Sequence, residues 1–139
     1  MSLGLYLHIP YCFSKCRYCD FYSAPGQRGV PRAYVDALLR ELSRFAPDAP
    51  LRPDTLYFGG GTPSLLDPAD AARLIAAAQP LPGAEITLEA NPETVTEDSL
   101  RAFREAGVNR ISFGVQSARD SQLKTLGRPH TAKQARAAF

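Results

Sequence analysis

Short apolar runs alternate along this chain with segments in which apolar residues recur at helical spacing. The runs are rich in β-branched and aromatic residues, have the length expected of strands, and occur at 5–9, 55–58, 85–89 and 110–115. Four successive strand–helix alternations indicate an α/β fold with a parallel sheet. Because four βα units cannot close a barrel, we expect a curved, open sheet with an exposed edge.

Residues that start and stop helices lie between the runs. The first helix is predicted to begin at Pro31 and to be broken by the prolines that follow it, Pro47, Pro50 and Pro53. Capping residues predict three later helices: Asp67 with Pro68 to about Ala78, Thr96 to Gly107, and Thr131 with Gln134 onward. The last helical pattern is still running at Phe139, so we expect 1–139 to be the N-terminal part of a longer protein.

Composition narrows the class of protein. The chain has 139 residues, of which 45% are hydrophobic and 22% charged, as in an ordinary globular domain. A net charge of +2 does not favour nucleic acid as a partner. We find no apolar run long enough for a transmembrane segment and no secretory signal, so we expect a cytoplasmic protein.

The 3 cysteines are confined to one short segment, with Cys12, Cys16 and Cys19 in the spacing C-x3-C-x2-C. An odd, clustered set is a poor disulfide framework and is more often metal-binding or catalytic. Three thiolates on one tight loop can ligate three corners of a cubane [4Fe–4S] cluster. A missing fourth protein ligand would leave one iron open to a substrate.

Two other interpretations of the cysteines stay open at this point. Structural zinc needs four ligands, and His8 is the only nearby candidate for the fourth. A redox-active pair formed by Cys16 and Cys19 would leave Cys12 without a role. We assign a catalytic role neither to His8 nor to His130.

Ligand-binding features also occur where predicted strands end. Gly59, Gly60 and Gly61 follow the second strand and lack side chains, so their backbone can approach a ligand closely. Glu89 ends the third strand and Gln116 follows the fourth. Ligands of parallel α/β folds gather at the carboxyl ends of the strands, so we expect these residues at one site.

The cysteine segment resembles the signature of the radical SAM superfamily, in which an aromatic residue, here Tyr18, precedes the last cysteine. The chain is more particularly similar to the oxygen-independent coproporphyrinogen III oxidases and their relatives, the HemW-type heme chaperones. The stretches that carry this resemblance lie at 5–12, 59–64, 89–92, 112–117 and 126–130, in the order expected.

The resemblance implies a partial radical SAM (β/α) barrel, a [4Fe–4S] cluster and S-adenosylmethionine (SAM). The cluster would be held by Cys12, Cys16 and Cys19, and an electron donor would reduce it so that SAM is cleaved to a 5′-deoxyadenosyl radical. The same resemblance implies SAM contacts from Tyr6, Tyr18, Gly60, Gly61, Thr62, Glu89, Gln116 and Arg128.

Two functions remain within that family. The oxidases decarboxylate coproporphyrinogen III to protoporphyrinogen IX, whereas the chaperones bind heme and transfer it. The oxidases tend to carry a further cysteine where this chain has Phe21, and an N-terminal arm that is missing before Cys12. Both departures favour the heme chaperone, with heme or a porphyrinogen as the partner in the full-length protein, and leave open whether it is an enzyme.

Overall fold

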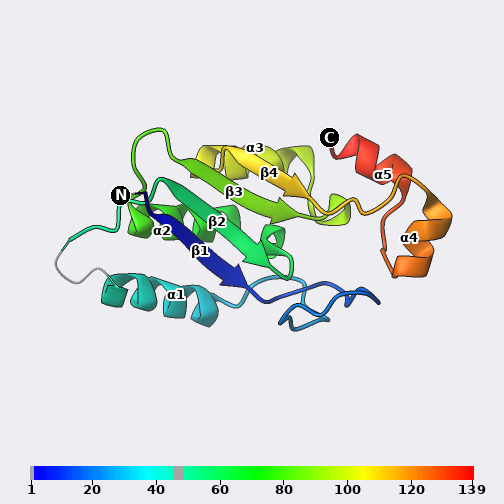
Figure 1. The fold of residues 1–139 in the computed structure, drawn as a ribbon, viewed down its shortest axis with the longest axis horizontal. Coiled ribbons are helices and arrows are strands. Elements are labelled where there is room, and N and C mark those ends of the chain that lie inside the picture. Colours follow the sequence, from blue (N-terminus) through cyan, green and yellow to red (C-terminus); the bar gives the residue numbers. More distant parts are fainter. Residues whose placement is uncertain (1, 46–48) are drawn as a thin grey trace.

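The computed structural model of the protein describes residues 2–45 and 49–139. Strands and helices alternate in chain order, as the apolar pattern predicts (Figure 1). The elements are β1 (Gly4–Ile9), α1 (Arg32–Phe45), β2 (Thr55–Gly60), η1 (Pro63–Leu65), α2 (Pro68–Ala78), β3 (Glu85–Ala90), η2 (Pro92–Thr94), α3 (Glu97–Ala106), β4 (Arg110–Phe113), α4 (Asp120–Leu126) and α5 (Ala132–Ala137). The expected break at Pro47 lies outside the described residues.

The strands form one open sheet in the order β1-β2-β3-β4, with every neighbouring pair parallel. This confirms the predicted α/β class and the open parallel sheet. Helix α2 packs against both α1 and α3, and α2 and α3 pass behind the strands in Figure 1. The strands all point the same way, so their carboxyl ends meet at one edge of the layer, where α4 and α5 lie beyond them.

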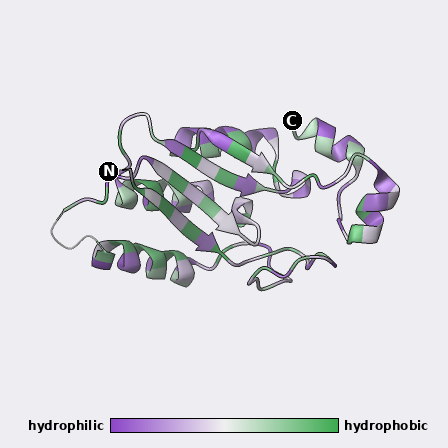
Figure 2. Cartoon of the chain, in the orientation of Figure 1, coloured by the Kyte–Doolittle hydropathy of each residue, from purple (hydrophilic) through white to green (hydrophobic). Residues whose placement is uncertain are grey.

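One face of the sheet forms the hydrophobic core. Leu7, Phe58 and Leu88 lie in register on that face and are fully or almost fully buried. Helix side chains such as Leu74 and Phe103 complete the same cluster. The alternation of apolar and polar residues along the strands is visible in Figure 2, and it allows one face to be buried while the other carries polar chemistry.

The other face is aromatic and polar. Tyr6 of β1, Tyr57 of β2, Thr87 of β3 and Arg110 of β4 stand in one row across the sheet. The rings of Tyr6 and Tyr57 stack with centroids 6.0 Å apart. Because no helix covers this face among the described residues, Tyr6 remains half exposed.

The capping residues predicted from the sequence act as expected. Asp67 accepts from the Ala69 amide, and Thr96 and Thr131 each form a capping box. Gly107 ends α3 in the left-handed conformation, at φ 113°. Among the described residues, no helix has the length and apolar character needed to cross a membrane.

The largest departures from the sequence prediction are two strand ends and one helix. Strand β2 continues through Gly60, so Gly59 and Gly60 are strand residues and only Gly61 begins the turn. Strand β4 stops at Phe113 instead of 115, because the next ladder donor to the Gly114 carbonyl would be residue 92, a proline without an N–H; Arg128 donates to that carbonyl instead. Helix α4 was not predicted, since it is short and Arg119 at its N-cap makes no side-chain cap.

Candidate functional site

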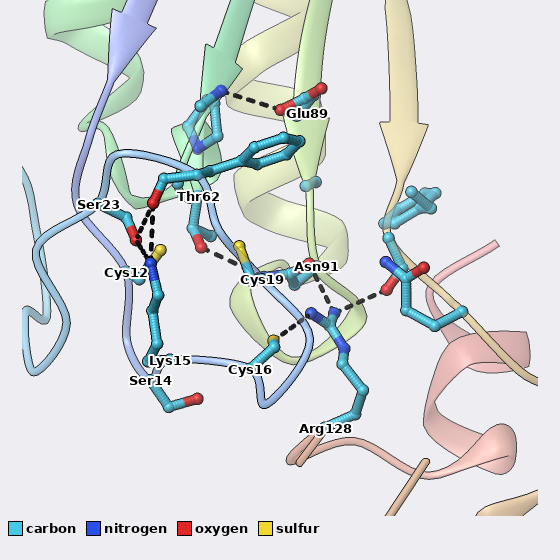
Figure 3. A pocket seen from close by; sticks show the side chains of 18 of the residues that line it. Cys12, Ser14, Lys15, Cys16, Cys19, Ser23, Thr62, Glu89, Asn91 and Arg128 are labelled. Carbon is cyan, nitrogen blue, oxygen red and sulfur yellow. Dashed lines mark hydrogen bonds between the residues drawn. The ribbon is translucent and has the colours of Figure 1, made fainter. Parts of the chain in front are cut away.

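A cavity of about 380 Å³ lies at the carboxyl ends of the strands, beneath the cysteine loop (residues 10–24). It collects side chains from the cysteine loop, from all three strands that follow β1, and from the α4–α5 connection (Figure 3). The topology therefore brings together residues that are far apart in the sequence, as expected for parallel α/β folds.

The cysteine loop is closed at its base by backbone hydrogen bonds. The Cys12 amide donates to the Ala24 carbonyl at 3.0 Å, and the Ala24 amide donates to Pro10 at 2.6 Å. Inside the loop, Lys15 Nζ donates to the Phe21 carbonyl at 2.8 Å and to Ser23 Oγ at 2.9 Å. These contacts hold the two halves of the loop together and leave the cysteine side chains to line the cavity.

All three cysteines are free thiols; Cys12 is buried, while Cys16 and Cys19 are partly exposed. Among the described residues, no three His, Cys, Asp or Glu side chains converge closely enough to hold a single metal ion. A cubane cluster does not require such convergence, since each thiolate binds a different iron. Three thiols at separate points of one cavity wall therefore fit the donor set of a cluster.

The glycine turn brings strand β2 against the cysteine loop. A Cβ on Gly61 would lie 2.7 Å from the Tyr11 carbonyl oxygen and 2.8 Å from Cys12 Sγ. A Cβ on Gly60 would lie 2.7 Å from the ring of His8. Both glycines line the cavity, but the groups that require them to be glycine belong to the protein itself. Close approach to a ligand is thus not the only reason for this turn.

Glu89 is held by two donors from β2. Tyr57 Oη donates to Glu89 Oε1 at 2.8 Å, and the Gly60 amide donates to Oε2 at 3.1 Å. Each carboxylate oxygen keeps further acceptor capacity. Burial, followed by the hydrogen bond to Glu89 and its charge, raises the pKa of Tyr57, so the phenol stays protonated and donates. Glu89 is therefore a fixed acceptor at the cavity wall.

Arg128 links the cysteine loop to two strand ends (Figure 3). Its Nη1 donates to Cys16 Sγ at 3.2 Å, and its Nη2 donates to Asn91 Oδ1 and to the Gly114 carbonyl, both at 2.7 Å. The side chain is only 4% exposed, and its Nε is buried without a partner among the described residues. An unsatisfied buried donor costs about 1–3 kcal/mol, so an acceptor supplied by a ligand fits this position.

Gln116 adopts a backbone conformation that is rare for a residue with a side chain. Its φ is 66°, in the left-handed region, directly after the segment that leaves β4. Such strained residues cluster at ligand sites when their surroundings hold them in place. Gln116 is among the residues that line the cavity.

The two predicted aromatic contacts have different positions. Tyr18 lines the cavity, and burial followed by the neighbouring Cys16 raises its pKa. Tyr6 lies on the open face of the sheet and is not among the residues that line the cavity; its hydroxyl lies 3.1 Å from His8 Nδ1. The other ring nitrogen of His8 lies 3.0 Å from the Tyr22 carbonyl oxygen. Both ring nitrogens thus face oxygen atoms, and His8 is not among the residues that line the cavity.

The structure thus gathers all predicted site residues except Tyr6 around one cavity. The residues are Cys12, Cys16, Tyr18, Cys19, Gly60, Gly61, Thr62, Glu89, Gln116 and Arg128. The cavity wall also includes Asn91. Its side-chain Nδ2 donates to Thr62 Oγ1 at 3.2 Å, and its Oδ1 accepts from Arg128. Asn91 is not among the predicted site residues, although its place just after β3 already indicated the site.

Comparison with known proteins agrees with this geometry. The family model described as the radical SAM superfamily matches residues 6–139. The chain is 47% identical to heme chaperone HemW of Escherichia coli, over 98% of this chain and 38% of that protein. It is 41% identical to the mitochondrial radical S-adenosyl methionine domain-containing protein 1 of Bos taurus, over 95% of this chain and 31% of that protein.

A solved structure is also similar. The structure of coproporphyrinogen III oxidase (HemN) from Escherichia coli, described as a radical SAM enzyme, superposes with a TM-score of 0.83 and 31% identity, over 99% of this chain and 33% of that chain. The chain therefore spans about a third of the length of these relatives. Since the superfamily model covers nearly the whole sequence and the fold and cysteine loop agree with it, the chain belongs to the radical SAM superfamily.

Proposed function

We propose that Cys12, Cys16 and Cys19 each bind one iron of a [4Fe–4S] cluster and that SAM occupies the remainder of the cavity. One observation carries this proposal. Three thiols share a single cavity with a fixed carboxylate acceptor and a buried guanidinium that has an unused donor. The arrangement suits a ligand that presents both anionic and cationic groups, as the methionine part of SAM does.

The roles of the other residues follow from their donors and acceptors. Arg128 offers Nε to an anionic oxygen, whereas Glu89 accepts from an ammonium or hydroxyl group. Thr62 and Gln116 add polar contacts, Gly60 and Gly61 admit the ligand to the backbone, and Tyr18 offers a ring face. Contact between Tyr6 and SAM stays a prediction, because Tyr6 does not line the cavity.

The cluster, when bound and reduced by an electron donor, supplies the electron that cleaves the sulfonium of SAM. The protein's own residues orient the ligand and limit the access of water. Cys12 is 7% exposed, and the closed loop covers the cavity on one side. Arg128 places a fixed positive charge beside Cys16 Sγ, at 3.2 Å, which complements the negative charge of thiolate ligands.

For the whole protein we propose a heme chaperone. The relatives named HemW support this reading, and so does Phe21, which stands at the position where the oxidases tend to have a further cysteine. Phe21 is among the residues that line the cavity and is 65% exposed. An oxygen-independent coproporphyrinogen III oxidase is the second candidate, favoured by the structural similarity to HemN. The cytoplasmic location stays a prediction.

The proposal is tested on the full-length protein, purified and reconstituted without oxygen. Iron, sulfide and zinc are measured first, and zinc without iron or sulfide would overturn the cluster. The protein is then incubated with SAM, reductant and either heme or coproporphyrinogen III. Stoichiometric heme binding without porphyrinogen turnover is expected for the chaperone, whereas formation of protoporphyrinogen IX would assign the oxidase function instead.

A further inference from the structure

A buried polar pair lies just outside the cavity and is not used by the proposed ligand contacts. His130 has a side chain that is 0% exposed, and its Nδ1 lies 3.0 Å from Glu93 Oε2. Its Nε2 lies 3.1 Å from the Val115 carbonyl oxygen. Glu93 is itself only 16% exposed. Burying charged and polar groups costs free energy, which the hydrogen bonds between them only partly offset. The presence of this pair in the interior therefore suggests that it has a structural or functional role.

The pair joins three segments that are distant in the sequence. Glu93 belongs to η2, which follows β3; Val115 follows β4; and His130 lies in the connection between α4 and α5. Both ring nitrogens of His130 face an oxygen, so the imidazole bridges η2 to the exit of β4. These are the two strand ends from which Asn91 and Gln116 reach the cavity.

The same connection also contacts the cysteine loop. The Arg17 amide donates to the Leu126 carbonyl at 3.1 Å, and Arg128 Nη1 donates to Cys16 Sγ. Glu93 Oε2 lies 4.0 Å from Arg128 Nη2, so one carboxylate oxygen faces both His130 and Arg128. Residues 126–130 therefore touch the cysteine loop on one side and both strand ends on the other.

We propose that Glu93 and His130 are positioning residues that hold Arg128 and Gln116 in the geometry that binds SAM. His130 fixes the Val115 carbonyl, directly before the left-handed Gln116, while Arg128 fixes the Gly114 carbonyl. Neither Glu93 nor His130 lines the cavity, so they act through the residues they hold. This inference rests on the proposed SAM site and adds the support on which that site depends.

Two substitutions test the pair with little change in shape. Glu93→Gln keeps the volume of the side chain but removes the charge that faces His130 and Arg128, and His130→Gln removes the imidazole bridge. Thr131→Ala is the matched control, because Thr131 is adjacent to His130 and caps α5 but has no hydrogen bond to Arg128 or Glu93. Loss of that cap lowers stability without altering the pair.

The first measurement uses the full-length protein without its cluster. Amide hydrogen exchange at Arg17, Leu126, Gly127, Arg128 and His130 is expected to accelerate in Glu93→Gln and His130→Gln, and to stay at the wild-type rate in Thr131→Ala. The second uses the reconstituted protein, in which we expect the Kd for SAM to rise about 10-fold in the first two variants alone. The partners of metal-ligating side chains change affinity about 10–100-fold when they are lost, and we expect the lower end of that range for side chains that hold Arg128 and Gln116.

The outcomes separate this inference from the proposed function. If wild-type protein binds SAM and both variants bind it equally well with unchanged exchange, the positioning role is wrong and the SAM site stands. If wild-type protein binds no SAM, the proposed site fails, and the exchange data alone decide whether the pair orders the connection. If Thr131→Ala raises the Kd for SAM as much as the other two variants do, the rise comes from a general loss of stability, and the inference is overturned.

Discussion

The contact between Gly61 and the cysteine loop offers a sharp test, because the added group in Gly61→Ala is a single methyl. Its carbon would lie 2.7 Å from the Tyr11 carbonyl oxygen, 2.8 Å from Cys12 Sγ and 3.0 Å from the Pro10 carbonyl carbon. Ordinary contact begins at 3.4 Å, so the nearest atoms must retreat by about 0.7 Å. The neighbours are mainly backbone, which cannot move aside by rotating a side chain.

The loss of stability in Gly61→Ala has two sources, the steric overlap itself and the hydrogen bonds of the displaced loop. Overpacking of this size destabilises proteins by about 1–3 kcal/mol. The same shift would lengthen two backbone hydrogen bonds. The Gly61 amide donates to the Ile9 carbonyl at 2.9 Å, and the Thr62 amide donates to the Tyr11 carbonyl at 2.8 Å. We therefore expect Gly61→Ala to lower the free energy of unfolding by about 1–3 kcal/mol and to raise the alkylation rate of the buried Cys12 at least ~5-fold.

The assay is urea denaturation of the cluster-free protein, combined with alkylation kinetics resolved for each cysteine by peptide mass mapping. Gly29→Ala is the matched control, because its Cβ would meet only the Leu65 carbonyl oxygen, at 3.9 Å, and its backbone is outside the left-handed region. Equal unfolding free energies and equal Cys12 rates in the two variants would refute the idea that Gly61 exists to admit the loop.

Three further predictions concern the thiols and the tyrosine beside Glu89. Cys16→Ala should abolish cluster binding, since two thiolates hold a cubane poorly; full iron and sulfide content in that variant would contradict the assignment. Tyr57→Phe removes the donor to Glu89 Oε1 and should weaken SAM binding by about 0.5–1.5 kcal/mol in equilibrium dialysis, whereas Tyr34→Phe, which loses a bond to the His8 carbonyl outside the cavity, should not. The pKa of Tyr57 is raised in the folded protein, so its stabilising contribution is complete below pH ~10 and is lost as pH rises through the folded pKa. The stability difference between wild type and Tyr57→Phe should therefore shrink above that pH, and a constant difference in denaturation experiments would count against a raised pKa of Tyr57, to which burial contributes before the Glu89 contact.

Much of the fold could be predicted because its signals are local. Asp67, Thr96 and Thr131 cap helices through bonds to amides no more than three residues away, so the signal and its partner lie in the same stretch of sequence. Helix α4 was not predicted, because its N-terminal residue makes no such side-chain hydrogen bond. The end of β4 was not predicted because it depends on the register with β3, which places Pro92, a residue without an N–H, where the next ladder donor would be.

Some residues of the candidate site could likewise be predicted from local sequence, whereas others could not. The spacing of Cys12, Cys16 and Cys19 and the strand-end positions of Glu89 and Gln116 were sufficient to predict a shared site. The sequence could not assign a role to Asn91, because its partners, Thr62 and Arg128, come from other segments. Nor could it place Tyr6 away from the cavity, since that depends on how β1 is registered against β2.

By itself, the sequence determined the order of strands and helices, the parallel α/β class and the concentration of thiols in one loop. Each depends on periodicity, capping or spacing within a few residues. The tertiary structure alone decided that Arg128 meets Cys16 across 112 positions, that His130 bridges two strand ends, and that Gly61 packs under the cysteine loop. Such contacts follow from strand register and the packing of connections, because parallel strands bring their carboxyl ends together whatever the distance along the chain.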